Sequence, residues 1–171
     1  MDLVVEPRGT HGLARWGDRR FACAVGRAGA RPDKREGDGA TPVGKFPLRR
    51  VLFRPDRLFL PATGLPTVAI GPADGWCDDP ADPRYNRPVR LPRPTSAESL
   101  WRPDHVYDLV LVVGHNDSPP VPGLGSGIFV HVARPDFAPT AGCVALAPAD
   151  LAAIVADARA GDALVVLPPA P

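Results

Sequence analysis

Proline and glycine constrain what this chain can fold into more than any other feature of its sequence. There are 23 prolines and 17 glycines among 171 residues. Because proline lacks a backbone N–H and clashes with the preceding helical turn, long helices are hard to build at this density. Hydrophobic residues still make up 44% of the chain, and the prolines and glycines separate apolar runs without replacing them. The sequence therefore predicts a folded, mostly β domain of short strands joined by long irregular loops.

The length is that of one domain, and no internal repeat or linker divides it, so we expect a single domain over residues 1–171. The net charge of +1, from 20 Lys and Arg against 19 Asp and Glu, argues against a strongly basic nucleic-acid surface. No stretch reaches the length of a membrane-spanning helix. The printed N-terminus has no apolar core, so no secretory signal is visible.

Hydrophobic alternation places the secondary structure along the chain. A hairpin with its turn at Gly17-Asp18 is expected over residues 15–25. One convincing helix is expected at about 148–160, with Pro148 and Asp150 in its first turn. Further strands are expected at residues 3–5, 48–53, 68–70, 109–113, 128–132 and 163–167.

The segment 71–104 is long and irregular, yet Trp76, Tyr85 and Trp101 are spread through it. Long loops in compact domains are usually functional or disordered, and aromatic residues are scarce in disordered segments. We expect this segment to pack over the domain as a lid or wall. Trp76 is then either a wall of a substrate cleft or a packing residue.

The segment 127–146, GIFVHVARPDFAPTAGCVAL, carries the candidate chemistry. An imidazole near a thiol can draw off its proton and stabilise the thiolate, so His131 and Cys143 are candidates for a nucleophilic pair. Gly142 would let the backbone turn tightly, so that N–H groups face an oxyanion. Taken alone, a buried structural cysteine and a core histidine are the commoner fates of such residues. The other two cysteines, Cys23 and Cys77, we interpret as structural or incidental. No cysteine spacing resembles a zinc site.

These residues resemble the catalytic signature of the YkuD family of L,D-transpeptidases, in which a histidine precedes a Ser/Thr-His-Gly-Cys segment and an aliphatic residue. The match runs through His131, Thr140, Gly142, Cys143 and Val144. A second family element, Asp-x-x-Thr-Pro-x-Gly-x-Phe, is similar to DGATPVGKF at 38–46. The two motifs occur in the family's order, and the resemblance spans roughly residues 20–167.

Two departures from the family pattern concern the pocket. The usual histidine before the Gly-Cys pair is Ala141 here, and the usual arginine two residues after the cysteine is Ala145. Arg134 either replaces some of the lost positive charge or is a solvated surface residue. The TAGCVAL version resembles a compact proteobacterial branch of the family.

The resemblance implies a YkuD-like β-sandwich or barrel-like fold and a cysteine acyltransferase that needs no metal or cofactor. Cys143 would attack a peptidoglycan stem peptide, with His131 as general base, a backbone carbonyl near Val132 orienting it, and the N–H groups of Gly142 and Cys143 at the oxyanion. Donor and acceptor would both be stem peptides, cross-linked at an ordinary or an altered position, and carbapenems would acylate the enzyme. The substrate class implies the periplasm or cell envelope, and we expect a monomer.

Several points stay open at this level. His115 and Asn116 either line the substrate cleft or face solvent in a turn, and Thr140 is expected to contact substrate. An L,D-carboxypeptidase or an endopeptidase would use the same residues. A catalytically silent cell-wall-binding module is the alternative from another class, although the presence of both His131 and Cys143 argues against it.

Overall fold

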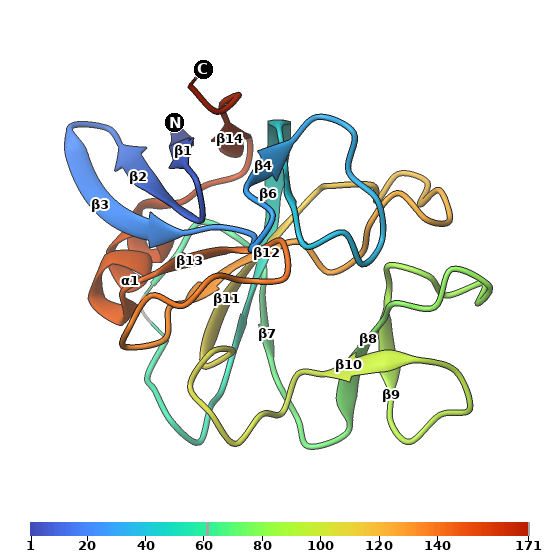
Figure 1. Cartoon of the computed structure of the whole chain (residues 1–171). Helices are drawn as coiled ribbons and strands as arrows, with labels where there is room; N and C mark the ends of the chain where they lie inside the picture. The colour runs from blue at the N-terminus through green and yellow to red at the C-terminus, as the bar shows by residue number, and fades with distance from the viewer. Residues whose placement is uncertain (61, 171) are drawn as a thin grey trace.

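The computed structural model describes residues 1–60 and 62–170, and these contain fourteen strands and one helix (Figure 1). The strands are β1 (Asp2–Arg8), β2 (His11–Trp16), β3 (Arg19–Ala24), β4 (Ala30–Arg31), β5 (Thr41–Pro42), β6 (Gly44–Phe53), β7 (Thr67–Ala69), β8 (Asp74–Cys77), β9 (Pro88–Arg90), β10 (Ala97–Ser99), β11 (Leu109–Val113), β12 (Phe129–Val132), β13 (Val144–Leu146) and β14 (Ala163–Val166). The helix α1 covers Pro148–Asp157. Within the described residues, no helix has both the length and the apolar character needed to cross a membrane.

The main sheet closes on itself. Its strands run in the order β11-β12-β13-β3-β2-β1-β14-β6-β7, and β11 also pairs with β6. That additional pairing joins the two sides of the sheet into a barrel-like structure, with β7 attached outside to β6. Closure leaves few unpaired strand edges, which is how many small all-β proteins satisfy their backbone groups. The mostly β, barrel-like fold expected from the sequence is confirmed.

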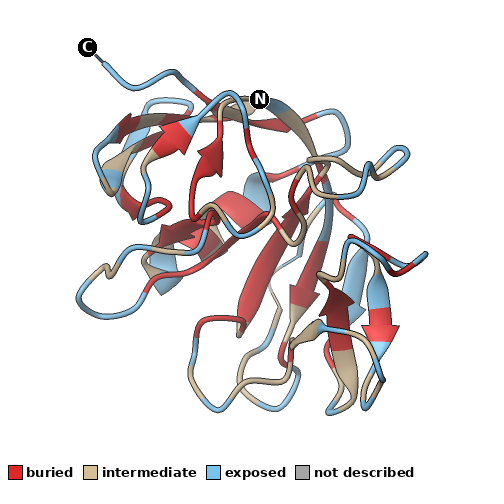
Figure 2. Cartoon of the chain, turned by 45° about the vertical axis from the view of Figure 1, so that its right-hand side comes forward, coloured by how far each residue is buried: buried red, intermediate tan, exposed pale blue. Residues whose placement is uncertain are grey.

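The core lies between the barrel strands and α1. All five residues of β11 and all four of β12 are buried. The helix contacts both strands and buries Leu151, Ile154 and Val155 against them. Each such aliphatic side chain contributes about 1.5–3 kcal/mol on full burial. Figure 2 shows the buried residues gathered in these strands and in α1, while the connecting loops are a mixture of intermediate and exposed residues.

Most expected elements are present with small shifts at their ends. The hairpin is confirmed as β2 and β3, with Gly17 at φ +59° in its turn. The helix begins at Pro148 as expected but ends at Asp157, short of residue 160, because Ala158 adopts the extended conformation with ψ 140°. The turn that follows is held by a hydrogen bond from the Arg159 N–H to Asp162 Oδ2, 2.8 Å.

The segment 71–104 is ordered, as expected, but it is less irregular than its sequence indicates. It forms a separate antiparallel sheet in the order β10-β8-β9, seen at the lower right of Figure 1. These strands are three or four residues long and are separated by prolines, so they carry no readable alternation. We call this small sheet, residues 74–99, the lid sheet. Trp76 on β8 packs edge-on against Phe129 of the barrel, with ring centroids 5.0 Å apart.

Candidate active site

Cys143 and His131 lie on one face of two neighbouring parallel strands. β12 and β13 pair in parallel, with Val130 opposite Val144 and His131 opposite Ala145. Because side chains alternate along a strand, this register puts His131 and Ala145 on the same face. Phe129 and Cys143, each two residues earlier in the chain, point to that face as well. The small side chain of Ala145 therefore lies beside the imidazole, at the position where the family usually has an arginine.

The Cys143 sulfur is buried and held by two backbone groups. Its side chain is 8% exposed. Sγ accepts a hydrogen bond from the Phe129 N–H at 3.3 Å and donates one to the Gly127 carbonyl oxygen at 3.2 Å. Burial, with a smaller contribution from the Glu98 carboxylate, raises the pKa of Cys143 to about 12. The resting residue is therefore a thiol, and its proton must be removed before the sulfur can attack a carbonyl.

His131 lines the same pocket as Cys143. Its Nδ1 lies 3.0 Å from the Val132 carbonyl oxygen. A carbonyl can only accept a hydrogen bond, so Nδ1 carries the hydrogen and Nε2 is left with a free lone pair. Burial lowers the pKa of His131 to about 4, so the ring is neutral near pH 7. Tyr107 packs edge-on against the imidazole, with centroids 5.5 Å apart, and fixes its orientation from the other side. His131 and Cys143 do not share a hydrogen bond in this resting arrangement of the described residues.

Gly142 makes a turn that no other residue fits. Its φ is +143°, and a Cβ at this position would lie 2.8 Å from the Ala40 carbonyl oxygen. The Gly142 N–H donates to Thr140 Oγ1 at 3.0 Å, and the Thr140 hydroxyl donates to the Cys143 carbonyl oxygen at 2.6 Å. Thr140 thus ties together the turn that presents the sulfur.

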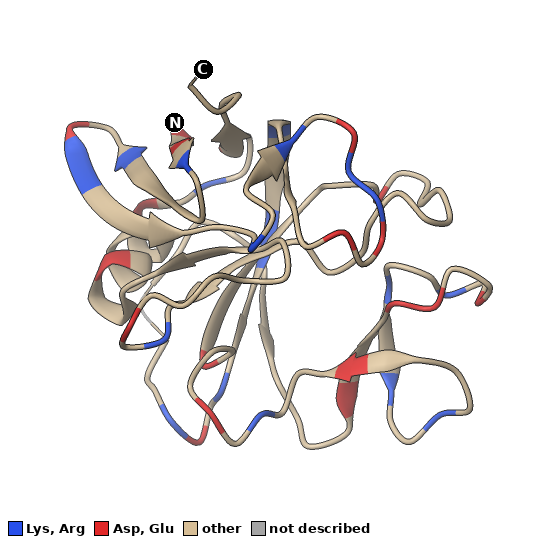
Figure 3. Ribbon diagram, viewed as in Figure 1, with Lys and Arg blue, Asp and Glu red and all other residues tan. Residues whose placement is uncertain are grey.

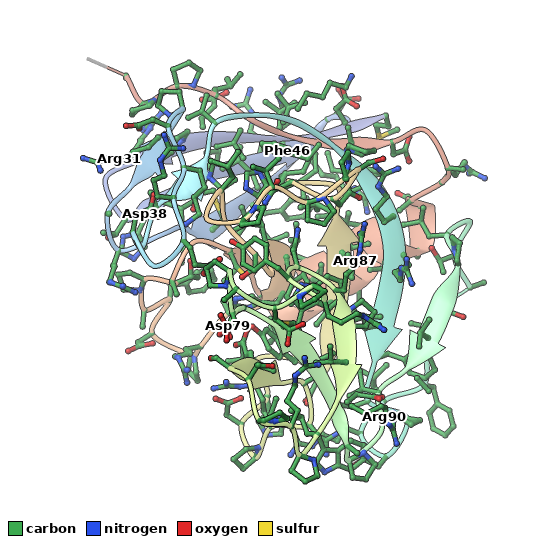
Figure 4. The ribbon with its side chains drawn as sticks, turned by 90° about the vertical axis from the view of Figure 1, so that its right-hand side faces the viewer. Arg31, Asp38, Phe46, Asp79, Arg87 and Arg90 are labelled. Atoms are coloured by element: carbon green, nitrogen blue, oxygen red, sulfur yellow. The ribbon has the colours of Figure 1, made fainter. Side chains whose placement is uncertain are left out.

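A pocket of about 490 Å³ opens above these residues. Its volume lies in the usual range for a small-molecule or peptide site. Its floor includes His131, Cys143 and Ala145, and its walls come from the loop after β4 and from the lid sheet. Figure 4 labels Asp38 and Asp79, which mark these two segments, Asp38 lying above Asp79 in that view.

The first part of the motif at 38–46, DGATP (38–42), is linked by hydrogen bonds to the turn that contains Thr140. The Arg27 N–H donates to the Thr140 carbonyl oxygen at 2.8 Å, and the Thr140 N–H donates to the Val25 carbonyl oxygen at 2.9 Å. The Gly26 N–H in turn donates to Thr41 Oγ1 at 2.8 Å. The two sequence motifs, about a hundred residues apart, therefore meet in one hydrogen-bonded unit.

The pocket also contains residues that the sequence analysis did not select. Lys34 is 6% exposed and lines the pocket, although a charged, glycine-rich stretch such as the one around it is typical of an exposed loop. Glu98, Arg102 and Tyr107 line the opposite side. The Tyr107 hydroxyl donates to Glu98 Oε1 at 2.7 Å, and the Arg102 guanidinium lies over the Tyr107 ring at 5.4 Å. The one sequence signal for a buried Lys34 is its spacing of four residues from Asp38, which allows the two side chains to pair.

Arg134 and Trp76, for which the sequence left a pocket role and a bland alternative open, both line the pocket. Arg134 lines it, but its side chain is 49% exposed and it pairs with Asp104 at 3.3 Å. Trp76 lines it as well and is 8% exposed. Its indole N–H donates to Asn86 Oδ1 at 2.9 Å, so the residue is both a wall of the pocket and a packing residue.

His115 and Asn116 lie outside the pocket lining. His115 Nε2 is 3.0 Å from the Leu124 carbonyl oxygen, and its ring packs edge-on against Phe46. The Asn116 amide donates to the carbonyl oxygens of Val121 and Gly125, both at 3.0 Å. Both side chains therefore hold the loop before β12 in shape and do not reach the space above Cys143.

All three cysteines, Cys23, Cys77 and Cys143, are buried and free, and of these Cys143 lines the pocket. Within the described residues, no group of three or more His, Cys, Asp or Glu side chains is arranged to hold a metal ion.

The fold and pocket define a class of protein: a closed β-barrel with a thiol and a neutral imidazole on the floor of a polar pocket. The model of one family, the L,D-transpeptidase catalytic domain YkuD, matches residues 9–167. The chain therefore belongs to the YkuD family, whose members are cysteine-dependent L,D-transpeptidases acting on the peptides of cell-wall peptidoglycan. A comparison with curated proteins and another with solved structures gave no match.

Proposed function

We propose that this chain is a peptidoglycan L,D-transpeptidase with Cys143 as nucleophile and His131 as general base. The observation that carries the proposal is the shared face of β12 and β13, where the neutral imidazole, oriented by the Val132 carbonyl, and the buried thiol both border one pocket. A nucleophile, a base and a group that orients the base are the parts that cysteine acyl transfer requires.

The first half of the reaction forms a thioester. His131 Nε2 accepts the thiol proton as Sγ attacks the carbonyl carbon of the L-centre of the donor stem. A C–S bond forms, and the carbonyl oxygen becomes an oxyanion. When the oxyanion collapses, the C–N bond to the following D-residue breaks, and His131 returns its proton to the leaving amine. The thiol has to leave its hydrogen bond with the Gly127 carbonyl for this step, because that bond holds the proton in the resting state.

The oxyanion is stabilised by backbone donors at the turn. The Cys143 N–H makes no hydrogen bond with the described residues and serves as the principal donor. The Gly142 N–H, which donates to Thr140 Oγ1 in the resting turn, joins it only if the threonine hydroxyl rotates away. Thr140 thereby contributes to substrate binding through the turn as well as through its place in the pocket lining.

The second half of the reaction transfers the acyl group. An amine of an acceptor stem attacks the thioester, the C–S bond breaks, and the new amide joins two stems while the thiol regains its proton. Arg134 and Trp76, which line the pocket, are the side chains we assign to substrate contact. Water in place of the amine gives a carboxypeptidase. We attribute the choice of cross-link position to the shape of the pocket floor, where Ala145 replaces the family's usual arginine. The site of action is the cell envelope, where the polymer lies.

Product analysis tests this proposal. The purified protein is incubated with disaccharide-tetrapeptide muropeptides, and the products are read by mass spectrometry. A dimer that has lost one D-amino acid supports the transpeptidase. Accumulation of tripeptide alone would establish the carboxypeptidase instead, cleavage of added dimers would indicate an endopeptidase, and the absence of any product would leave a wall-binding module.

A further inference from the structure

The loop after β4 carries a buried lysine beside the turn that presents Cys143. Lys34 is 6% exposed, whereas two of the three arginines at the same pocket, Arg27 and Arg134, are exposed and the third, Arg102, is half-buried. Taking an ammonium group out of water costs several kcal/mol unless it is paired. A chain with only two lysines has therefore placed one of them where its charge is costly. Figure 3 shows that the loop after β4 carries both basic and acidic residues.

Asp38 of the DGATP motif holds this lysine in place. Lys34 Nζ and Asp38 Oδ1 form a part-buried ion pair. The same carboxylate accepts hydrogen bonds from the N–H groups of Ala40 and Arg35, both at 2.8 Å. The stem of Lys34 packs closely at Gly125, where a Cβ would lie 3.1 Å from it. Both ends of the side chain are thus fixed, so the ammonium has one position.

That position adjoins the catalytic turn. A Cβ built on Gly142 would lie 3.4 Å from Lys34 Nζ, which is ordinary van der Waals contact. The ammonium is therefore next to the residue that precedes Cys143. An ammonium group has three N–H donors. Asp38 is the one acceptor that Lys34 Nζ reaches among the described residues, so two donors remain for whatever occupies the pocket.

We propose that the Lys34 ammonium is a catalytic charge that stabilises the anionic Cys143 sulfur and then the oxyanion, with Asp38 as its positioning residue. The inference rests on the function proposed above. Lys34 keeps its proton throughout, so it adds an electrostatic contribution and no proton-transfer step. Lys34, in the loop after β4, supplies positive charge at a pocket where Ala145 leaves the position two residues after the cysteine uncharged.

Two further features agree with this role. The charge of Lys34 acts to lower the pKa of Cys143, opposing the larger effects of burial and of Glu98 on the other wall. The proposal also explains why the DGATP motif lies beside the site: its aspartate pairs with the lysine, and its Ala40 carbonyl packs against Gly142. Removing one fixed charge or donor at an oxyanion costs about 10²–10³ in rate when the site excludes water.

The test compares Lys34→Met with the matched variant Lys45→Met, which removes an exposed lysine paired with Asp2. Alkylation of Cys143 by iodoacetamide is followed across pH by mass spectrometry of the Cys143 peptide. Because iodoacetamide is uncharged, its rate reports the thiolate and not the binding of a substrate carboxylate. We expect the Lys34→Met profile to move to higher pH, with a rate at pH 8 at least about tenfold lower. Lys45→Met should match the wild type.

Two more variants protect the test against misfolding. Lys34→Arg keeps the charge and should retain most of the alkylation rate, and Asp38→Asn should give an intermediate loss, because the lysine remains but is no longer fixed. If Lys34→Met is folded by circular dichroism and shows the wild-type profile, the inference is wrong. If its profile is unchanged but its KM rises, Lys34 binds a substrate carboxylate and the inference is likewise wrong. A folded Cys143→Ala variant that still turns over muropeptide would instead overturn the proposed function.

Discussion

His131 Nδ1 lies 3.0 Å from the carbonyl oxygen of Val132, the next residue along the same strand. This bond selects one tautomer of the ring. The hydrogen sits on Nδ1, and Nε2 is left as a base. The histidine therefore needs no aspartate to orient it, and a backbone group that no substitution can remove takes that role.

The first prediction concerns His131 as general base. His131→Gln should lower kcat/KM for muropeptide by about 10²–10⁴, because the thiol then has no base to accept its proton. The measurement is the initial rate of D-amino acid release. His11→Gln, which changes an exposed histidine on β2, is the matched control and should leave the rate unchanged. A His131→Gln rate within threefold of the wild type would contradict the pairing.

The second prediction concerns stability against pH. Because burial depresses the pKa of His131 from 6.5 to about 4, the unfolded chain takes up a proton below about pH 6.5 that the folded chain refuses until about pH 4. The free energy of unfolding should therefore fall as the pH drops through this window. Denaturant unfolding at several pH values should show a smaller slope for His131→Gln and the wild-type slope for His11→Gln. Equal slopes for all three proteins would refute the buried neutral histidine.

The third prediction concerns the turn at Gly142. Gly142→Ala combines an unfavourable φ with a clash against the Ala40 carbonyl, so it should abolish most activity. Gly161→Ala provides the control, because Gly161 has φ +96° but open space around its Cβ position. Both variants should lose about 1–3 kcal/mol of stability through strain, yet only Gly142→Ala should lose activity. Full activity of Gly142→Ala would show that the turn is not needed.

The fourth prediction concerns Glu98. Its carboxylate, after burial, is the next cause of the raised pKa of Cys143. Glu98→Gln removes this charge and keeps an oxygen for the Tyr107 hydroxyl, so the alkylation profile of Cys143 should move to lower pH. Glu6→Gln, on β1 and outside the pocket lining, should not move it. A shift of the Glu98→Gln alkylation profile to higher pH would contradict the assignment of Glu98 as a group that raises the pKa of Cys143.

The barrel strands could be predicted because their signals are local. β11 was expected at 109–113, where the structure has it, since five consecutive apolar residues form a buried strand. The helix start at Pro148 was equally readable. The lid sheet was not predicted, because its strands are three or four residues long and are stabilised by contacts such as Trp76 on Phe129 and not by their own pattern.

The same contrast holds at the site. Cys143 and His131 stand in a recognisable segment, so their candidacy followed from the sequence. Lys34 could not be selected from the sequence, because a charged stretch next to glycines is typical of an exposed loop. Its burial depends on the ion pair with Asp38, which belongs to a separate motif. His115 and Asn116 were chosen for their place before the catalytic strand, but backbone carbonyls of the same loop take their side chains. Whether such a side chain bonds to its own loop or faces the cleft depends on the three-dimensional arrangement of the loop, which the sequence does not give.

The most direct test of the account is the mass of the protein after incubation with a carbapenem. The wild type should gain the mass of one carbapenem, and the adduct should map to the peptide that contains Cys143. Cys23→Ala and Cys77→Ala should gain the same mass, because both thiols are buried and outside the pocket lining, whereas a folded Cys143→Ala should gain none. An adduct on Cys143→Ala, or a wild type that stays unmodified while it turns over muropeptide, would contradict Cys143 as the nucleophile.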